Sequence, residues 1–176
     1  MNAVDGIDKE ELKQLLVRCW MTHDAMWFAN ALKEVGIETA NRLNLGAIRS
    51  LAPIEVRRIL RALGIDEVED PDRLKLFLEG TMQLVGGDFM AFEWNWRPDG
   101  SLCVDVERCF AHEGITRLGA IEQYQCGIFE RICAWLDALG IDYDIAPAEK
   151  RCMMHFEGRC HRDLRFRFDA RASGAP

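Results

Sequence analysis

The chain has 176 residues, of which 49% are hydrophobic and 29% are charged, and its formal net charge is −7. This is the composition of a globular protein, and the negative charge argues against nucleic acid as a partner, because phosphate binding needs a concentrated positive face. No apolar run approaches the roughly 18 residues of a membrane span and no export signal is evident at the N-terminus, so we expect a cytoplasmic protein with no membrane partner.

The first half of the chain has helical periodicity. Asp8 can cap the first helix, and Gly36 and Gly64 are suited to helix C-termini. Pro53 is expected in the first turn of a helix, where its missing N–H is tolerated. The pattern predicts four or five helices within residues 8–86.

The apolar period then changes from 3.6 to 2. Residues 89–96 and 101–109 alternate between apolar and polar, and Pro98, Asp99 and Gly100 between them favour a hairpin turn. If Arg97 faces Ser101, six side chains share the face toward the core. They are Phe92, Trp94, Trp96, Leu102, Val104 and Val106.

A helix and three strands are expected after the hairpin. The apolar stripe over residues 117–140 predicts one long helix that ends at Gly140. Residues 141–146, 150–156 and 159–170 are interpreted as strands.

Together these elements predict an α+β fold, in which a helical N-terminal half packs on an antiparallel sheet with one long helix, as a hairpin-helix-hairpin unit. We expect a single α+β domain over residues 1–168. Its helical part covers residues 8–86, and the sheet with the long helix covers residues 88–168. Residues 169–176 are expected to form a disordered tail.

The segment "CWMTHDAMWFANALKEVG", residues 19–36, is the first candidate site. On one helix His23, Trp27 and Asn30 continue the stripe of Leu12 and Leu16. A buried polar stripe must be satisfied by protein, water or ligand, so it could line a pocket. The alternative is a bend near Thr22 that leaves the polar residues in solvent.

The cysteines form the second candidate site. The chain has seven, none of them spaced as C-x-x-C, and in a cytosolic protein they should carry no obligatory disulfide. If Glu157 and Gly158 form a two-residue turn, His155 lies across from Cys160, and the long helix can bring Cys126 over them.

This second constellation has three interpretations. Cys160 with His155 could act as nucleophile and base. The thiols of Cys109, Cys126 and Cys160 with the imidazole of His155 would suit tetrahedral zinc, which is the one cofactor that the pattern suggests. Buried, inert cysteines are the more common explanation, because reactivity needs a perturbed thiol in a polar setting.

Arg162 is expected to point inward, because its parity in the last strand places it with the apolar residues. A buried cation without a partner is costly. It could therefore pair with a buried carboxylate or hold the carboxylate of a substrate.

Several segments resemble a known family. "CWMTHDAMWFANALKEVGIETANRLN", "AIRSLAPIEVRRILRALG", "ERCFAHEG", "QYQCGIFERICAWLDALG" and "GRCHRDLRFRF" are similar to small, uncharacterised bacterial proteins related to L-2-amino-thiazoline-4-carboxylate hydrolase. The likeness covers most of residues 9–168. It rests on the H-D-x-x-W-F segment that begins at His23 and on Cys109, Cys126 and Cys160. The late cysteine pattern also resembles the 4-vinyl reductase-type small-molecule-binding domain. The resemblance implies an α+β fold with a small-ligand pocket.

Hydrolysis of a small cyclic cysteine-like compound would need a base, an acid and a carboxylate anchor. His23 or His155 could be the base, and Asp24 or Glu122 the acid or orienting group. Cys160 could be the nucleophile or a metal ligand, and Arg162 the anchor.

The alternative is a non-catalytic ligand-binding sensor or carrier, which would use the same cavity with Trp27, Trp94 and Trp96 as walls and no activated nucleophile. For either function the candidate ligand contacts are Trp27, Asn30, Cys126 and Arg162. Both functions imply a small-molecule ligand. Assembly as a homo-oligomer is left open.

Overall fold

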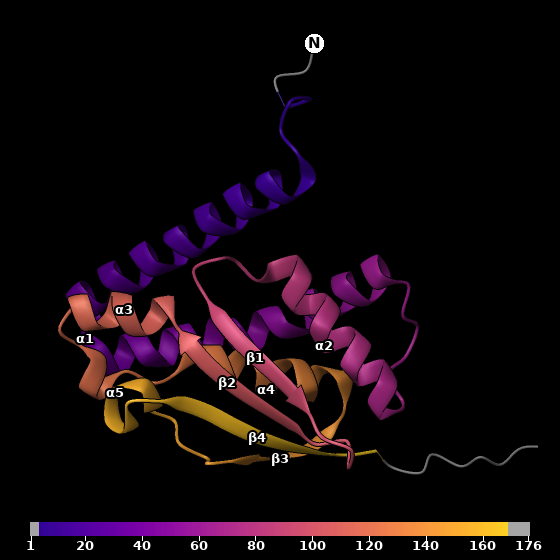
Figure 1. Ribbon diagram of the computed structural model, residues 1–176. Coiled ribbons are helices and arrows are strands. Elements are labelled where there is room, and N and C mark those ends of the chain that lie inside the picture. Colours follow the sequence, from indigo (N-terminus) through magenta and orange to yellow (C-terminus); the bar gives the residue numbers. More distant parts are fainter. Residues whose placement is uncertain (1–3, 169–176) are drawn as a thin grey trace, which may run out of the picture.

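The computed structural model describes residues 4–168, so the predicted tail at 169–176 lies outside the described residues. The structure has the predicted α+β class, with helices packed on an antiparallel sheet (Figure 1). The elements in chain order are α1 (Lys9–Leu63), α2 (Pro71–Val85), β1 (Ala91–Trp96), β2 (Leu102–Arg108), α3 (Phe110–Arg117), the 3₁₀ turn η1 (Ile121–Gln123), α4 (Gly127–Leu139), β3 (Asp142–Ala146), α5 (Met153–Glu157) and β4 (Cys160–Arg167).

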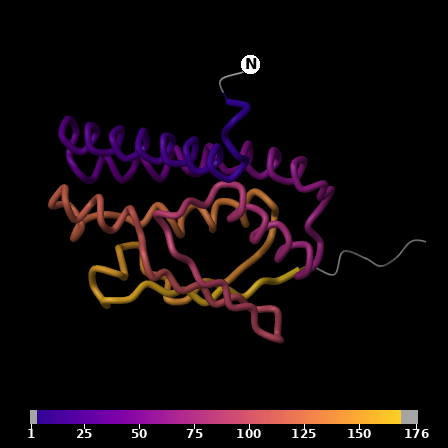
Figure 2. Tube along the Cα trace, turned by 45° about the horizontal axis from the view of Figure 1, so that its top comes forward, coloured from indigo at the N-terminus to yellow at the C-terminus, as the bar shows by residue number. Residues whose placement is uncertain are grey.

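Helix α1 is divided at Gly36, whose φ of 75° and ψ of 169° are not helical. We call residues 9–35 the first arm and residues 37–63 the second arm. The chain reverses at Gly36, and the second arm runs back beneath the first (Figures 1 and 2). The predicted cap at Asp8 is confirmed, because its carboxylate accepts from the backbone N–H groups of Glu10 and Glu11. The prediction for Pro53 was wrong: it lies inside the second arm, so fewer helices form than the sequence predicted.

The sheet is antiparallel, with the strand order β1-β2-β4-β3. The predicted hairpin is confirmed: the N–H of Arg97 donates to the carbonyl of Ser101 at 2.9 Å. Trp94 lies opposite Val104 and Trp96 opposite Leu102, as the alternation predicted.

Two predicted elements after the hairpin were wrong. The long helix expected over residues 117–140 is three pieces, because α3 ends before Gly119, which has a φ of 69°, and α4 begins only at Gly127. The strand expected over residues 150–156 is largely the short helix α5. A short apolar run such as "CMMHF" fits either structure, so its period could not decide between them.

The sheet, α2, α4 and the second arm share one core. Leu102, Val104 and Leu164 of the sheet are buried in the same cluster as Phe77 of α2 and Leu136 of α4. The first arm lies farther from the sheet, and its end packs in a second cluster with α3 and η1 (Figure 1). Within residues 4–168, no helix has the length and apolar character needed to cross a membrane.

Buried Glu55 joins the second arm to α4. Its carboxylate accepts from the indole Nε1 of Trp135 at 2.7 Å and from the guanidinium of Arg131. The same guanidinium lies 4.7 Å from the centroid of the Trp20 ring on the first arm. One arginine therefore ties α4 to both arms.

Candidate functional site

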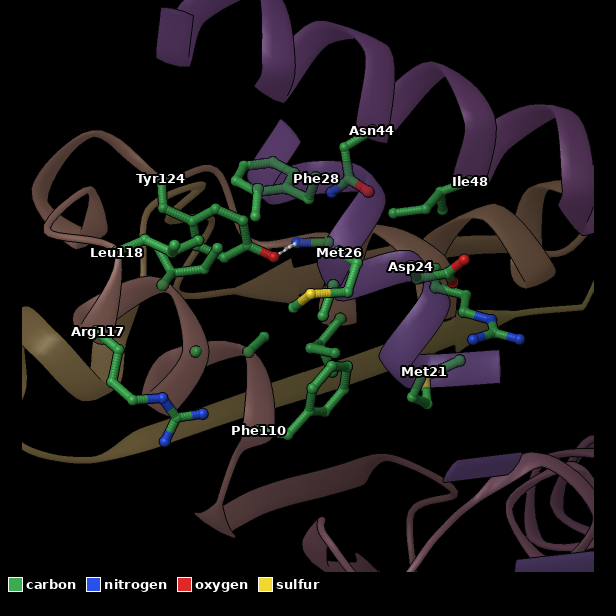
Figure 3. A pocket seen from close by; sticks show the side chains of 18 residues that line it. Met21, Asp24, Met26, Phe28, Asn44, Ile48, Phe110, Arg117, Leu118 and Tyr124 are labelled. Atoms are coloured by element: carbon green, nitrogen blue, oxygen red, sulfur yellow. Dashed lines mark hydrogen bonds between the residues drawn. The ribbon is translucent and has the colours of Figure 1, made fainter. Parts of the chain in front are cut away.

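The main candidate site is a pocket between the two arms of α1, α3 and the start of α4, with a volume of about 260 Å³ (Figure 3). We call it the α1–α3 pocket. Apolar side chains form most of its wall, among them Met21, Phe28, Ile48, Phe110, Ile115 and Leu118. Its polar side chains are Asp24, Asn44, Arg117, Tyr124 and Arg131. A cavity of about 150 Å³ is enough to bind benzene, so this pocket can hold a small organic molecule.

A buried asparagine fixes the loop that carries Tyr124. The side chain of Asn41 donates to the carbonyl of Gln123 at 2.8 Å and accepts from the N–H of Gln125 at 3.1 Å. The ring of Tyr124 lies edge-on to Phe28, with 5.7 Å between their centroids. Tyr124 is therefore held from both arms of α1.

The hydroxyl of Tyr124 is a buried polar group in this apolar wall. The residue is only 5% exposed, and its oxygen accepts from the backbone N–H of Gly127 at 3.1 Å (Figure 3). Burial raises the pKa of the Tyr124 phenol far above its ordinary range, so it stays protonated. The O–H remains available as a donor.

The two pocket arginines differ in their freedom. Arg131 is held by Glu55, whereas Arg117 is exposed and lies 4.0 Å from the carboxylate of Glu113 one turn earlier on α3. Exposed pairs of this kind contribute little energy, so Arg117 is free to meet a ligand at the pocket mouth.

The pocket continues into a second hollow of about 590 Å³ along the first arm. Met21, Met26 and Phe110 line both spaces, and Arg18 and Arg108 lie at the far side of the second. A ligand longer than the first pocket could extend in this direction.

The predicted stripe on the first arm does not line this pocket. The side chain of His23 is 77% exposed, Trp27 is 48% exposed, and exposed Asn30 donates to the carbonyl of Met26. The prediction that these three residues line a cavity was wrong. The segment does form a pocket wall, but with Met21, Asp24, Ala25 and Phe28, because the reversal at Gly36 turns that face inward.

Part of the predicted cysteine constellation comes together. Cys109, Cys126 and Cys160 line one small cavity of about 10 Å³, together with Cys152, which the sequence interpretation had left out. We call it the sulfur cavity. His155 does not line it: the residue is exposed on α5, and its ring packs against Phe156 with 4.9 Å between centroids.

The pairing of His155 with Cys160 across a hairpin was therefore wrong, and Cys160 instead pairs with Val106 of β2. The arrangement proposed for zinc was therefore also wrong, because it needed His155 beside the three thiols. Within residues 4–168, no three His, Cys, Asp or Glu side chains are grouped as ligands for a metal ion.

The thiols of Cys109, Cys126 and Cys160 are partly buried, and their apolar surroundings favour the protonated form. Burial raises the pKa of Cys109 and of Cys160 to about 12, and it raises the pKa of Cys126 as well. A nucleophilic cysteine needs a lowered pKa, so this environment does not activate Cys160. All seven cysteines are free, and each of them lies within the described residues.

Arg162 points inward, as its parity predicted, and is only 1% exposed. Its guanidinium donates to the carbonyls of His161 and Glu149, each at 2.8 Å, and stacks 4.7 Å from the Phe129 ring centroid. Among residues 4–168 no carboxylate forms an ion pair with it, so backbone carbonyls take the place of the expected acidic partner.

The sequence contains only weak indications of the pocket residues that were not predicted. Asn44 and Ile48 are one turn apart on the second arm, and Tyr124 and Gly127 flank Cys126. An asparagine in line with apolar residues of a helix is a detectable feature, but which residues lie opposite it depends on how α4 packs against α1.

The fold and the site thus define this protein as an α+β protein with an apolar pocket. The model of a family described as "Family of unknown function (DUF6125)" matches residues 5–83, which correspond to α1 and most of α2. No curated protein and no solved structure matches the chain significantly.

Proposed function

We propose that this protein binds an apolar small molecule in the α1–α3 pocket and acts as a carrier or sensor. The observation that carries the proposal is the pocket of about 260 Å³ between α1, α3 and α4, with apolar walls and a few polar groups. Ligand sites in proteins typically combine apolar walls with a small number of placed polar groups.

The geometry supports binding better than hydrolysis. A hydrolase of the L-2-amino-thiazoline-4-carboxylate type would need its nucleophile, base and anchor within reach of one substrate. His23 is in solvent, Cys160 faces the sulfur cavity, and Arg162 is occupied by carbonyls. If the protein is incubated with L-2-amino-thiazoline-4-carboxylate, we expect chromatography to detect no ring-opened thiol product. Turnover by the purified protein would contradict the proposal.

Binding can be tested with the apolar fluorescent probe N-phenyl-1-naphthylamine. Gly114 of α3 lines the pocket, and a side chain added there meets no protein atom within 4 Å. We expect Gly114→Leu to fill the pocket and to weaken probe binding at least about tenfold, equivalent to about 1.4 kcal/mol.

Gly46→Leu is the matched control. Gly46 is also a helical glycine with open space around its Cβ position, but it lies on the exposed face of the second arm. Both substitutions favour helix, so neither should unfold the protein. The proposal fails if the probe does not bind, or if both variants bind it as the unsubstituted protein does.

A further inference from the structure

We propose that the α1–α3 pocket recognises the carbonyl or carboxyl oxygen of an acyl compound, with the hydroxyl of Tyr124 and the amide of Asn44 as donors to that oxygen. This inference rests on the proposed function, because it assigns a ligand class to the same pocket. The acyl chain lies along the apolar wall.

The first observation is the unused proton of Tyr124. Its oxygen already accepts from the N–H of Gly127 at 3.1 Å, and within residues 4–168 its own O–H has no acceptor. At 5% exposure the group has little access to bulk water. A buried donor without an acceptor costs about 1–3 kcal/mol, which a ligand oxygen would recover.

The second observation is that Asn44 converges on the same place. A Cβ at Gly127 would lie 3.0 Å from Asn44 Nδ2 and 3.3 Å from the hydroxyl oxygen of Tyr124. Within the described part of the chain, the Asn44 side chain has no hydrogen bond. Figure 3 shows both side chains at one end of the pocket, on the side opposite Phe110. Because residue 127 has no side chain, Asn44, Tyr124 and Ile48 can all pack close to the start of α4, which brings the two donors near each other.

The local electrostatics favour an acceptor over a cation. Gly127 is the first residue of α4, and a helix N-terminus carries a partial positive charge of about half a unit. The thiol of Cys126, the capping residue, makes no capping hydrogen bond. An ammonium group at this end would meet two N–H or O–H donors and the positive end of the helix.

The apolar wall indicates the direction in which the acyl chain of the ligand would lie. From Tyr124 and Asn44 the pocket passes Phe28 and reaches Met21 and Phe110, where it joins the second hollow of about 590 Å³. A medium-chain acyl group can therefore extend between the first arm and α3, with its polar head at α4.

Displacement of N-phenyl-1-naphthylamine by eight-carbon ligands tests the inference. We expect octanoate and octanamide to displace the probe at concentrations at least about tenfold below that of octylamine, because one added hydrogen bond to an anion or amide is worth about that factor. If octylamine displaces the probe as well as octanoate and octanamide do, the inference is overturned while the proposed function stands. If the probe itself does not bind, the proposed function fails.

Substitution of the donors gives an independent readout. We expect Asn44→Leu to raise the dissociation constant of octanoate about tenfold relative to that of octylamine, with both constants corrected for the affinity of the variant for the probe. Asn95→Leu on the exposed face of β1 is the control and should change neither value. Tyr124→Phe should weaken octanoate in the same way. If octanoate displaces the probe equally well from Asn44→Leu and from the unsubstituted protein, Asn44 is not a donor and the inference is wrong.

Discussion

The phenolic oxygen of Tyr124 accepts a buried hydrogen bond of 3.1 Å from the backbone N–H of Gly127, the first residue of α4. The first N–H groups of a helix have no partner within the helix, so this bond both satisfies α4 and orients the tyrosine. It couples the start of the main sheet-covering helix to the wall of the pocket.

Removal of the Tyr124 hydroxyl should therefore destabilise the fold. Tyr124→Phe leaves the N–H of Gly127 buried without an acceptor, and we expect the free energy of unfolding to fall by about 1–3 kcal/mol. Urea denaturation monitored by circular dichroism measures this change. An unchanged midpoint with an unchanged slope would show that water or another group replaces the hydroxyl at no cost.

The reversal at Gly36 should depend on glycine. Its φ of 75° and ψ of 169° belong to a region that other residues rarely occupy, and no protein atom lies within 4 Å of its Cβ position. Gly36→Ala should therefore cost about 1–3 kcal/mol through backbone strain alone. Gly46→Ala, in regular helix with equally open space, should stabilise by about 0.5–1 kcal/mol. Equal effects in thermal unfolding would contradict the described reversal.

The buried carboxylate of Glu55 should be the most sensitive position on the second arm. Glu55→Ala leaves the guanidinium of Arg131 and the indole N–H of Trp135 without their acceptor, and breaking a buried pair costs about 3–5 kcal/mol. Glu55→Gln keeps one acceptor and should cost less. Glu38→Ala at an exposed position is the control. Chemical denaturation should rank the three variants in this order, and a tolerated Glu55→Ala would refute the described network.

The partly buried thiols of Cys109 and Cys160 should make the protein sensitive to alkali. The pKa of Cys160 and of Cys109 is raised from 9.0 to about 12, so both thiols are protonated in the folded and unfolded states below pH 9. Between pH 9 and 12 mainly the unfolded state loses these protons, and stability should fall as the pH rises through this window. Cys160→Ala should reduce the slope of unfolding free energy against pH. A stability independent of pH over this range would contradict the burial of these groups.

Much of the fold follows from local patterns in the sequence. Alternation and the Pro98-Asp99-Gly100 turn predicted the hairpin with its register, and parity predicted the inward direction of Arg162. These features depend on neighbouring residues and on the period of a strand, which the sequence contains directly.

The site was predicted less well from the sequence, because it depends on how elements that are distant in the chain pack together. Gly36 predicted the end of a helix but not the direction of the next one, and that direction decides whether His23 or Met21 faces inward. The His155 prediction failed at a run too short for its period to distinguish helix from strand. Cys109, Cys126 and Cys160 did meet, although without the histidine.

Binding of a small acyl compound in the α1–α3 pocket should be visible in the amide resonances of four glycines during an NMR titration with octanoate. Gly114 and Gly127 line the pocket, whereas Gly46 and Gly140 line neither it nor the second hollow. We expect saturable shifts for Gly114 and Gly127, with little change for Gly46 and Gly140. Shifts confined to Gly46 or Gly140, or no saturable shift at all, would contradict binding of an acyl compound in this pocket.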